Sequence, residues 1–143
     1  ETEKRKAFEA RIIDEAKPGE QQSETDHNLK SENSNSGDFH NRKWRDATGW
    51  FSYELKVRKD KPATLVCAYW GGDSGRREFD ILVNGEKIAA QKLNHNKPGE
   101  FFEVQYSIPE NLTKNNEKVT IKFQAFPESI AGGLFGIMTL KKE

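Results

Sequence analysis

The sequence predicts an all-β fold, an antiparallel β-sandwich of the jelly-roll kind with a polar N-terminal extension. Three observations carry this prediction. Apolar residues alternate with polar ones over several short stretches, which is the period of strands with one buried face. Turn pairs such as Asn84-Gly85 and Pro98-Gly99 separate these stretches, and helical signals are few. About seven short strands with this spacing favour a jelly-roll sandwich, with a closed barrel as the alternative.

The chain begins with a charged segment at residues 1–17. Its large apolar residues, among them Phe8 and Ile12, have helix-compatible spacing, and Pro18-Gly19 ends the pattern. We therefore expect a short helix or a linker there, followed by a single β-sandwich domain at 18–143.

The next segments lead from a polar loop into the middle of the sheet. Residues 20–41 are rich in Gln, Ser, Asn, Asp and Glu, which predicts a loop with at most a short edge strand. From 51 to 58 apolar and polar residues alternate, as in a half-buried strand. Residues 64–70 are apolar on both faces, which is typical of a central strand, and the glycine-rich stretch 71–75 ends it.

The second half of the chain repeats the alternating pattern. Asn84-Gly85 is the dipeptide best suited to a two-residue hairpin turn, because both positions tolerate positive φ. The strands expected in this half lie at 79–83, 88–93, 102–108, 118–125 and 134–140.

Composition excludes several classes of protein. Lys+Arg and Asp+Glu are equal at 23 each, so no net charge attracts nucleic acid or an anionic membrane. No stretch approaches the ~20 apolar residues that span a bilayer. Cys67, the only cysteine, allows no internal disulfide or thiolate metal cage, and its apolar neighbours predict that it is buried. Because the chain starts at Glu1 rather than Met, we expect a piece of a longer protein.

A cluster of aromatic and charged residues lies where the polar loop meets the sheet. Large aromatics at the lip of a β-structure can stack on sugar rings, while Arg or Asp binds the hydroxyls. The candidate ligand-binding residues are Trp44, Arg45, Asp46, Tyr69 and Trp70. The alternative is packing: we favour core positions for Trp50 and Tyr69, and for Trp44 contact with a neighbouring domain is an equal alternative.

Neither a metal site nor a catalytic site can be assigned. The three histidines lack the spacing of a metal motif and lie in apparent loops: His27, His40 and His95. Four aspartates offer oxygens for calcium but form no spaced acidic loop: Asp26, Asp38, Asp46 and Asp73. The only carboxylate pair considered for glycoside hydrolysis, Glu54 and Asp80, is expected on solvent faces. We therefore expect no cofactor, no metal and no enzymatic activity in this chain.

Five segments together resemble a known module. They are PGEQQ at 18–22, DHN at 26–28, WRDA at 44–47, GWFSY at 49–53 and the hairpin FDILVNG at 79–85. Over about residues 11–140 the chain resembles the C-terminal β-sandwich accessory domain, formerly of unknown function, of bacterial proteins related to β-L-arabinofuranosidases, as found in Bacteroides. The hairpin alone is shared by many galactose-binding-domain-like sandwiches, so the block around Trp44 and Trp50 is the more specific part.

The resemblance implies an accessory domain without the active site. In that glycosidase family an (α/α)-barrel carries a cysteine nucleophile beside zinc held by several cysteines and a glutamate, which Cys67 alone cannot build. The resemblance also implies a periplasmic or extracellular location.

Two functions from different classes follow from these observations. The preferred one is a structural module that braces the other domains of its parent glycosidase, with an exposed apolar patch near Trp44 and Arg45. The alternative is a carbohydrate-binding module for plant-type glycans that contain arabinose or galactose.

Overall fold

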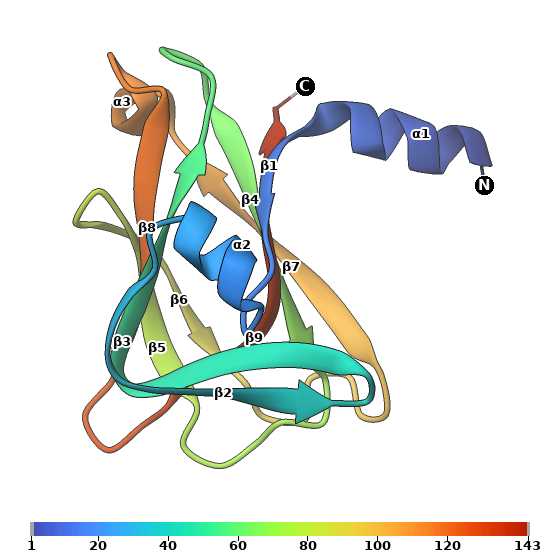
Figure 1. The fold of residues 1–143 in the computed structure, drawn as a ribbon, viewed down its shortest axis with the longest axis vertical. Helices are drawn as coiled ribbons and strands as arrows, with labels where there is room; N and C mark the ends of the chain where they lie inside the picture. The colour runs from blue at the N-terminus through green and yellow to red at the C-terminus, as the bar shows by residue number, and fades with distance from the viewer. Residues whose placement is uncertain (1, 143) are drawn as a thin grey trace.

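The computed structural model describes residues 2–142 and is dominated by strands (Figure 1). The helices are α1 (Thr2–Arg11), α2 (Gln21–Asp26) and α3 (Glu110–Thr113). The strands are β1 (Ile12–Ala16), β2 (Lys30–Phe39), β3 (Arg42–Lys56), β4 (Ala63–Trp70), β5 (Glu78–Val83), β6 (Glu86–Lys92), β7 (Phe101–Ile108), β8 (Lys118–Ala125) and β9 (Ala131–Lys141).

All strand pairs are antiparallel, and β3 joins two layers. The strand order is β6-β5-β8-β3-β9-β4-β7, with β1 added beside β9 and β2 beside β3. Residues 50–56 of β3 pair with β8, whereas Arg45 and Ala47 near its start pair with β9. The strands thus form an antiparallel sandwich that closes almost into a barrel, which confirms the all-β fold class.

Aromatic rings fill the space between the layers. On β3 the side chains of Phe51, Tyr53 and Leu55 are completely buried, as the alternation predicted. Phe51 stacks on Phe123 of β8 with ring centroids 5.0 Å apart. Cys67 is completely buried on β4, as its apolar neighbours predicted, and burial raises the pKa of its thiol.

Two N-terminal segments differ from the sequence expectation. The segment expected as a helix or linker contains α1, but Ile12–Ala16 form β1, which pairs with β9 and buries Ala16. Residues 20–41, expected as a loop with at most a short strand, contain α2 and the ten-residue β2. β2 has few apolar residues because most of it is exposed, so alternation could not reveal it.

Trp50 is the one aromatic residue whose expected core position is wrong. Phe51 and Tyr53 point into the core, so the two-residue period of β3 turns Trp50 to the outside. Its indole is half-buried there, and Lys122 Nζ lies 4.6 Å from the ring centroid.

The predicted turn at Asn84-Gly85 joins β5 to β6, with φ values of 50° and 85°.

A second hairpin, made by β2 and the first half of β3, matters more for function. It extends across one end of the sandwich, at the bottom of Figure 1. α1 projects from the opposite end, close to the C-terminus.

Candidate functional site

A cavity of about 210 Å³ lies where the β2–β3 hairpin meets the start of β9 and the loop after β4. Three aromatic rings, three charged side chains and one glycine surround it. They are Phe39, Trp44, Phe135, Asp46, Asp73, Arg77 and Gly133. We call it the aromatic-carboxylate cavity.

The alternation of β3 selects which side chains face this cavity. Trp44 and Asp46 are two residues apart and lie on one face of the strand, while Arg45 between them lies on the other. Gly37 on β2 is the cross-strand partner of Trp44. A Cβ at this glycine would lie 2.8 Å from Trp44 Cζ2, so the indole lies directly over the glycine backbone. The absence of a side chain at Gly37 therefore sets the position of the Trp44 ring.

Asp46 and Arg77 form a partly buried ion pair in the cavity. Arg77 Nη1 lies 3.6 Å from Asp46 Oδ2 and donates a 3.1 Å hydrogen bond to the carbonyl of Gly132. The exposed fractions of the two side chains are 16% for Asp46 and 21% for Arg77. Burial raises the pKa of Asp46, and the nearby Arg77 offsets part of this effect.

Asp73 differs from Asp46 because its carboxylate has no partner. Among residues 2–142, none donates a hydrogen bond to it, although its backbone carbonyl accepts one from the amide of His95. Burial raises the pKa of Asp73, and Arg77 only partly opposes this. Two acceptor oxygens are thus held in a half-buried cavity and remain free for a ligand.

An aromatic cluster supports the cavity from outside the sandwich. Its members are Phe39, His40, Trp70, Phe101 and Phe135. Trp70 contacts three of these rings, with centroids 5.1 Å from Phe39, 5.0 Å from His40 and 4.9 Å from Phe101. The cluster holds Phe39 and Phe135, two walls of the cavity, against the outer face of the sheet.

The structure brings together only some of the residues expected to bind a ligand. Trp44 and Asp46 line the cavity, and Trp70 lies behind its wall in the aromatic cluster. Tyr69 has no exposed surface, and its hydroxyl lies 2.9 Å from that of Tyr106, so its ring cannot contact a ligand in this conformation. Tyr69 thus occupies the core position that the sequence analysis favoured.

Arg45 is bound within the protein. Its Nε and Nη2 donate to the two oxygens of Glu24 at 2.6 and 2.9 Å, and Nη1 donates to Ser34 Oγ at 2.7 Å. Tyr53 donates a further 2.7 Å hydrogen bond to Glu24. This buried ion pair ties α2 to the hairpin. The geometry gives Arg45 a structural contact, and its expected contact with a ligand stays a prediction.

Sequence reasoning missed five residues of the cavity: Phe39, Asp73, Arg77, Gly133 and Phe135. They come from three separate segments, and only the topology brings them together. One signal was present, since Asp73 interrupts a glycine-rich turn, but it was considered only as a calcium ligand. Among the described residues, no group of three or more His, Cys, Asp or Glu is placed to hold a metal ion.

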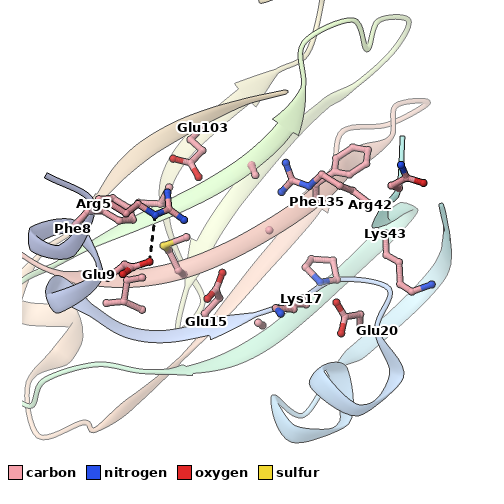
Figure 2. A pocket seen from close by; sticks show the side chains of 18 of the residues that line it. Arg5, Phe8, Glu9, Glu15, Lys17, Glu20, Arg42, Lys43, Glu103 and Phe135 are labelled. Atoms are coloured by element: carbon pink, nitrogen blue, oxygen red, sulfur yellow. Dashed lines mark hydrogen bonds and ion pairs between the residues drawn. The ribbon is translucent and has the colours of Figure 1, made fainter. Parts of the chain in front are cut away.

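A larger groove of about 810 Å³ runs along α1, β1 and the outer face of β9 (Figure 2). Arg5, Phe8 and Glu9 of α1 lie on one side, and Phe135 and Arg42 lie at the far end. Its lining mixes basic and acidic side chains, and α1 buries none of its residues. In its described lining, the groove therefore shares Phe135 with the smaller cavity but lacks its tryptophan and its partly buried ion pair between Asp46 and Arg77.

The fold and the cavity define an antiparallel β-sandwich module with a small cavity of aromatic and charged side chains. The chain belongs to DUF6805, a family of unknown function, whose pattern matches residues 7–140. No curated protein sequence matches the chain. No helix in the described part of the chain is long and apolar enough to cross a membrane.

Several solved structures share the fold at low sequence identity. A family 35 carbohydrate-binding module from Clostridium thermocellum has a TM-score of 0.61 and 12% identity, and the match covers 90% of this chain and 98% of that module. The ANXUR2 extracellular domain from Arabidopsis thaliana has a TM-score of 0.62 and 14% identity, with 90% and 41% covered. An exo-β-1,3-galactanase from Phanerochaete chrysosporium, solved with β-1,3-galactotriose, has a TM-score of 0.60 and 14% identity, with 87% and 28% covered.

The fraction of each chain covered by the match shows how the proteins compare in length. This chain spans almost all of the bacterial module but less than half of the plant domain and the fungal enzyme. At such identities the similarity establishes the fold alone.

Proposed function

We propose that this chain is a non-catalytic carbohydrate-binding module that holds a sugar residue in the aromatic-carboxylate cavity. The observation that carries the proposal is the carboxylate of Asp73, which is half-buried and has no hydrogen-bond donor within the described chain. Buried polar groups are normally paired, so one left free beside aromatic walls is typical of a ligand site. The similar bacterial module adds support through its fold.

The cavity offers the two kinds of contact that sugars need. The apolar C–H face of a sugar ring packs against the aromatic faces of Trp44 and Phe135. Its hydroxyl groups donate to the oxygens of Asp73 and Asp46, and Arg77 donates to a ring or hydroxyl oxygen. A volume of about 210 Å³ is below the usual range for drug-sized ligands and suits a single sugar residue.

The module would act as an accessory domain outside the cell. Binding to a glycan would keep an attached glycoside hydrolase close to its substrate and raise the effective substrate concentration. The resemblance to domains of β-L-arabinofuranosidase-like proteins supports such a parent enzyme and plant-type glycans that contain arabinose or galactose. It also supports a periplasmic or extracellular location.

Calorimetric titration with arabinose-, galactose- and rhamnose-containing oligosaccharides tests this function. We expect one of these sugars to bind, and Trp44→Ala to remove the binding heat while the variant stays folded. Trp50→Ala is the matched control, because Trp50 lies on the outer sheet face beside Lys122 and away from the cavity. The same loss in both variants, or no heat with any sugar, would contradict the proposal.

The second candidate function is the bracing of neighbouring domains in the same polypeptide. Phe39 favours it, because it is the only exposed large hydrophobic residue in the described chain, with 39% of its surface accessible. The groove beside α1 could receive another domain. One exposed ring is a small patch for a stable interface, so the cavity remains the better supported site.

A further inference from the structure

The charges around the aromatic-carboxylate cavity point to the class of sugar that it takes, if the proposed function holds. In their ordinary ionised forms, Asp46 and Asp73 bring two negative charges and Arg77 brings one positive charge. The cavity therefore carries an excess of negative charge. Two guanidinium groups of the neighbouring strand β3 are engaged elsewhere: Arg45 is bound to Glu24, and Arg42 lies over the ring of Phe101 at 4.4 Å.

Arg77 is the only cation among the described residues that line the cavity, and it already faces a carboxylate. Its Nη1 donates to the carbonyl of Gly132 and lies 3.6 Å from Asp46 Oδ2. Its other N–H groups can donate to a ligand oxygen, but a ligand carboxylate would share the single positive charge with Asp46. It would also lie near the unpaired carboxylate of Asp73, and like charges held close together in a partly buried site repel strongly.

The pKa directions agree with this charge balance. Burial raises the pKa of both Asp46 and Asp73, and the charge of Asp73 raises the pKa of Asp46 further. Arg77 opposes both effects without overcoming them. The single positive charge of Arg77 thus does not fully offset the negative charges of the two aspartates. A ligand carboxylate would add a third negative charge to the cavity.

Hydrogen-bonding capacity leads to the same conclusion. An ionised carboxylate only accepts hydrogen bonds, so Asp73 needs a donor from its ligand. An uncharged sugar residue has hydroxyl donors around its ring, whereas the carboxylate of a uronic acid replaces one hydroxyl donor by acceptors. We infer that the cavity selects uncharged sugar residues over uronic acids.

Matched pairs of methyl glycosides test this selection directly. The pairs are the galactoside with the galacturonide, the glucoside with the glucuronide, and the mannoside with the mannuronide, titrated at pH 7.5 and followed by amide NMR. In the pair with the correct stereochemistry, we expect the uncharged member to bind at least tenfold more tightly. Equal or tighter binding of the uronide would overturn the inference while leaving sugar binding intact. No binding by any pair, together with silence of the oligosaccharides, would overturn the proposed function and the inference with it.

A variant that removes one negative charge from the cavity tests whether the aspartates cause this selection. Asp46→Asn removes one negative charge and frees Arg77, so we expect the uronide to gain affinity severalfold relative to its uncharged partner. Asp38→Asn is the control, because Asp38 is exposed on the same hairpin and pairs with Lys43 outside the cavity. If Asp46→Asn does not fold, Asp73→Asn serves the same purpose. An unchanged preference in the folded cavity variant would contradict the role of these carboxylates in selection.

Discussion

The two faces of β3 near its start differ in how completely their polar groups are paired. On one face, Arg45 and Glu24 are almost buried and satisfy each other with hydrogen bonds of 2.6 and 2.9 Å. On the opposite face, Asp46 Oδ2 lies 3.6 Å from Arg77 Nη1, which also donates to the carbonyl of Gly132. The carboxylate of Asp73 accepts no hydrogen bond from any described residue. The complete network is typical of a structural contact and the incomplete one of a ligand site, although Arg45 and Asp46 are adjacent in sequence.

The largest expected effect comes from breaking the complete network. Arg45→Ala leaves the carboxylate of Glu24 buried without its main partner, so we expect a loss of about 3–5 kcal/mol in the free energy of unfolding. Chemical denaturation measures this loss. Lys43→Ala is the matched control, because its ion pair with Asp38 is exposed and contributes less than about 1 kcal/mol. Similar losses in both variants would contradict a structural role specific to the Arg45 face.

The second largest effect is on sugar binding at the cavity face of β3, without a loss of the fold. Gly37→Ala puts a Cβ only 2.8 Å from the Trp44 ring, so the indole must move out of its position. We expect sugar affinity to fall about tenfold, which corresponds to about 1.4 kcal/mol, while the fold is kept. Titration of the folded variant measures this. Gly136→Ala is the control, because its nearest contact would be an ordinary 3.4 Å. If Gly37→Ala binds as well as the unaltered chain, the Trp44 ring does not set the affinity.

Most of the fold could be predicted from the sequence, and the reason lies in its periodicity. Strands such as β5 and β8 have one buried face, so their apolar residues repeat every second position. β2 has no such face and was expected only as a short edge strand. Its pairing with β3 comes from backbone hydrogen bonds, which side-chain patterns do not record.

The candidate site was only half predictable. Trp44 and Asp46 were identified because aromatic and charged residues stand together in the sequence. Arg45 was assigned to the same role, because composition cannot tell which face of a strand a side chain takes until the register is known. Asp73 and Arg77 lie about thirty residues away, and only the packing of their loop against β9 and the hairpin brings them to Trp44.

A smaller effect depends on pH and concerns the attachment of α2, next to the complete network. His27 Nε2 lies 3.0 Å from Asp14 Oδ1 and Nδ1 lies 2.8 Å from the carbonyl of Ser23, so both nitrogens donate only in the charged form. Burial lowers the pKa of His27, but these hydrogen bonds outweigh it and the net shift is upward. Burial raises the pKa of Asp14, yet its hydrogen bonds with His27 and Lys56 bring the net shift downward.

The direction of these shifts fixes the pH range in which the pair stabilises the fold. The raised pKa of His27 contributes stability that is complete below about pH 6.5 and is lost as the pH rises through the folded value. The lowered pKa of Asp14 contributes stability that is lost as the pH falls below about 3.8. We expect His27→Gln to cost about 1–2 kcal/mol near pH 5.5 and less at pH 9, measured by denaturation at both values. A cost independent of pH would contradict a charged His27 in the folded chain.

The smallest expected effect on stability comes from the carboxylate that has no partner. Asp73→Asn keeps the size of the side chain and removes a charge that burial disfavours, so the free energy of unfolding should change by less than about 0.5 kcal/mol. Because the folded pKa of Asp73 is raised, its ionised form destabilises the fold above that pKa, and any change at neutral pH should be a gain. Sugar affinity should nevertheless fall, since the amide offers one acceptor oxygen in place of two. Denaturation and titration of the same sample should show that stability is kept or raised while binding weakens. A clear loss of stability would instead show that Asp73 has a structural role, like that of Arg45 and Glu24.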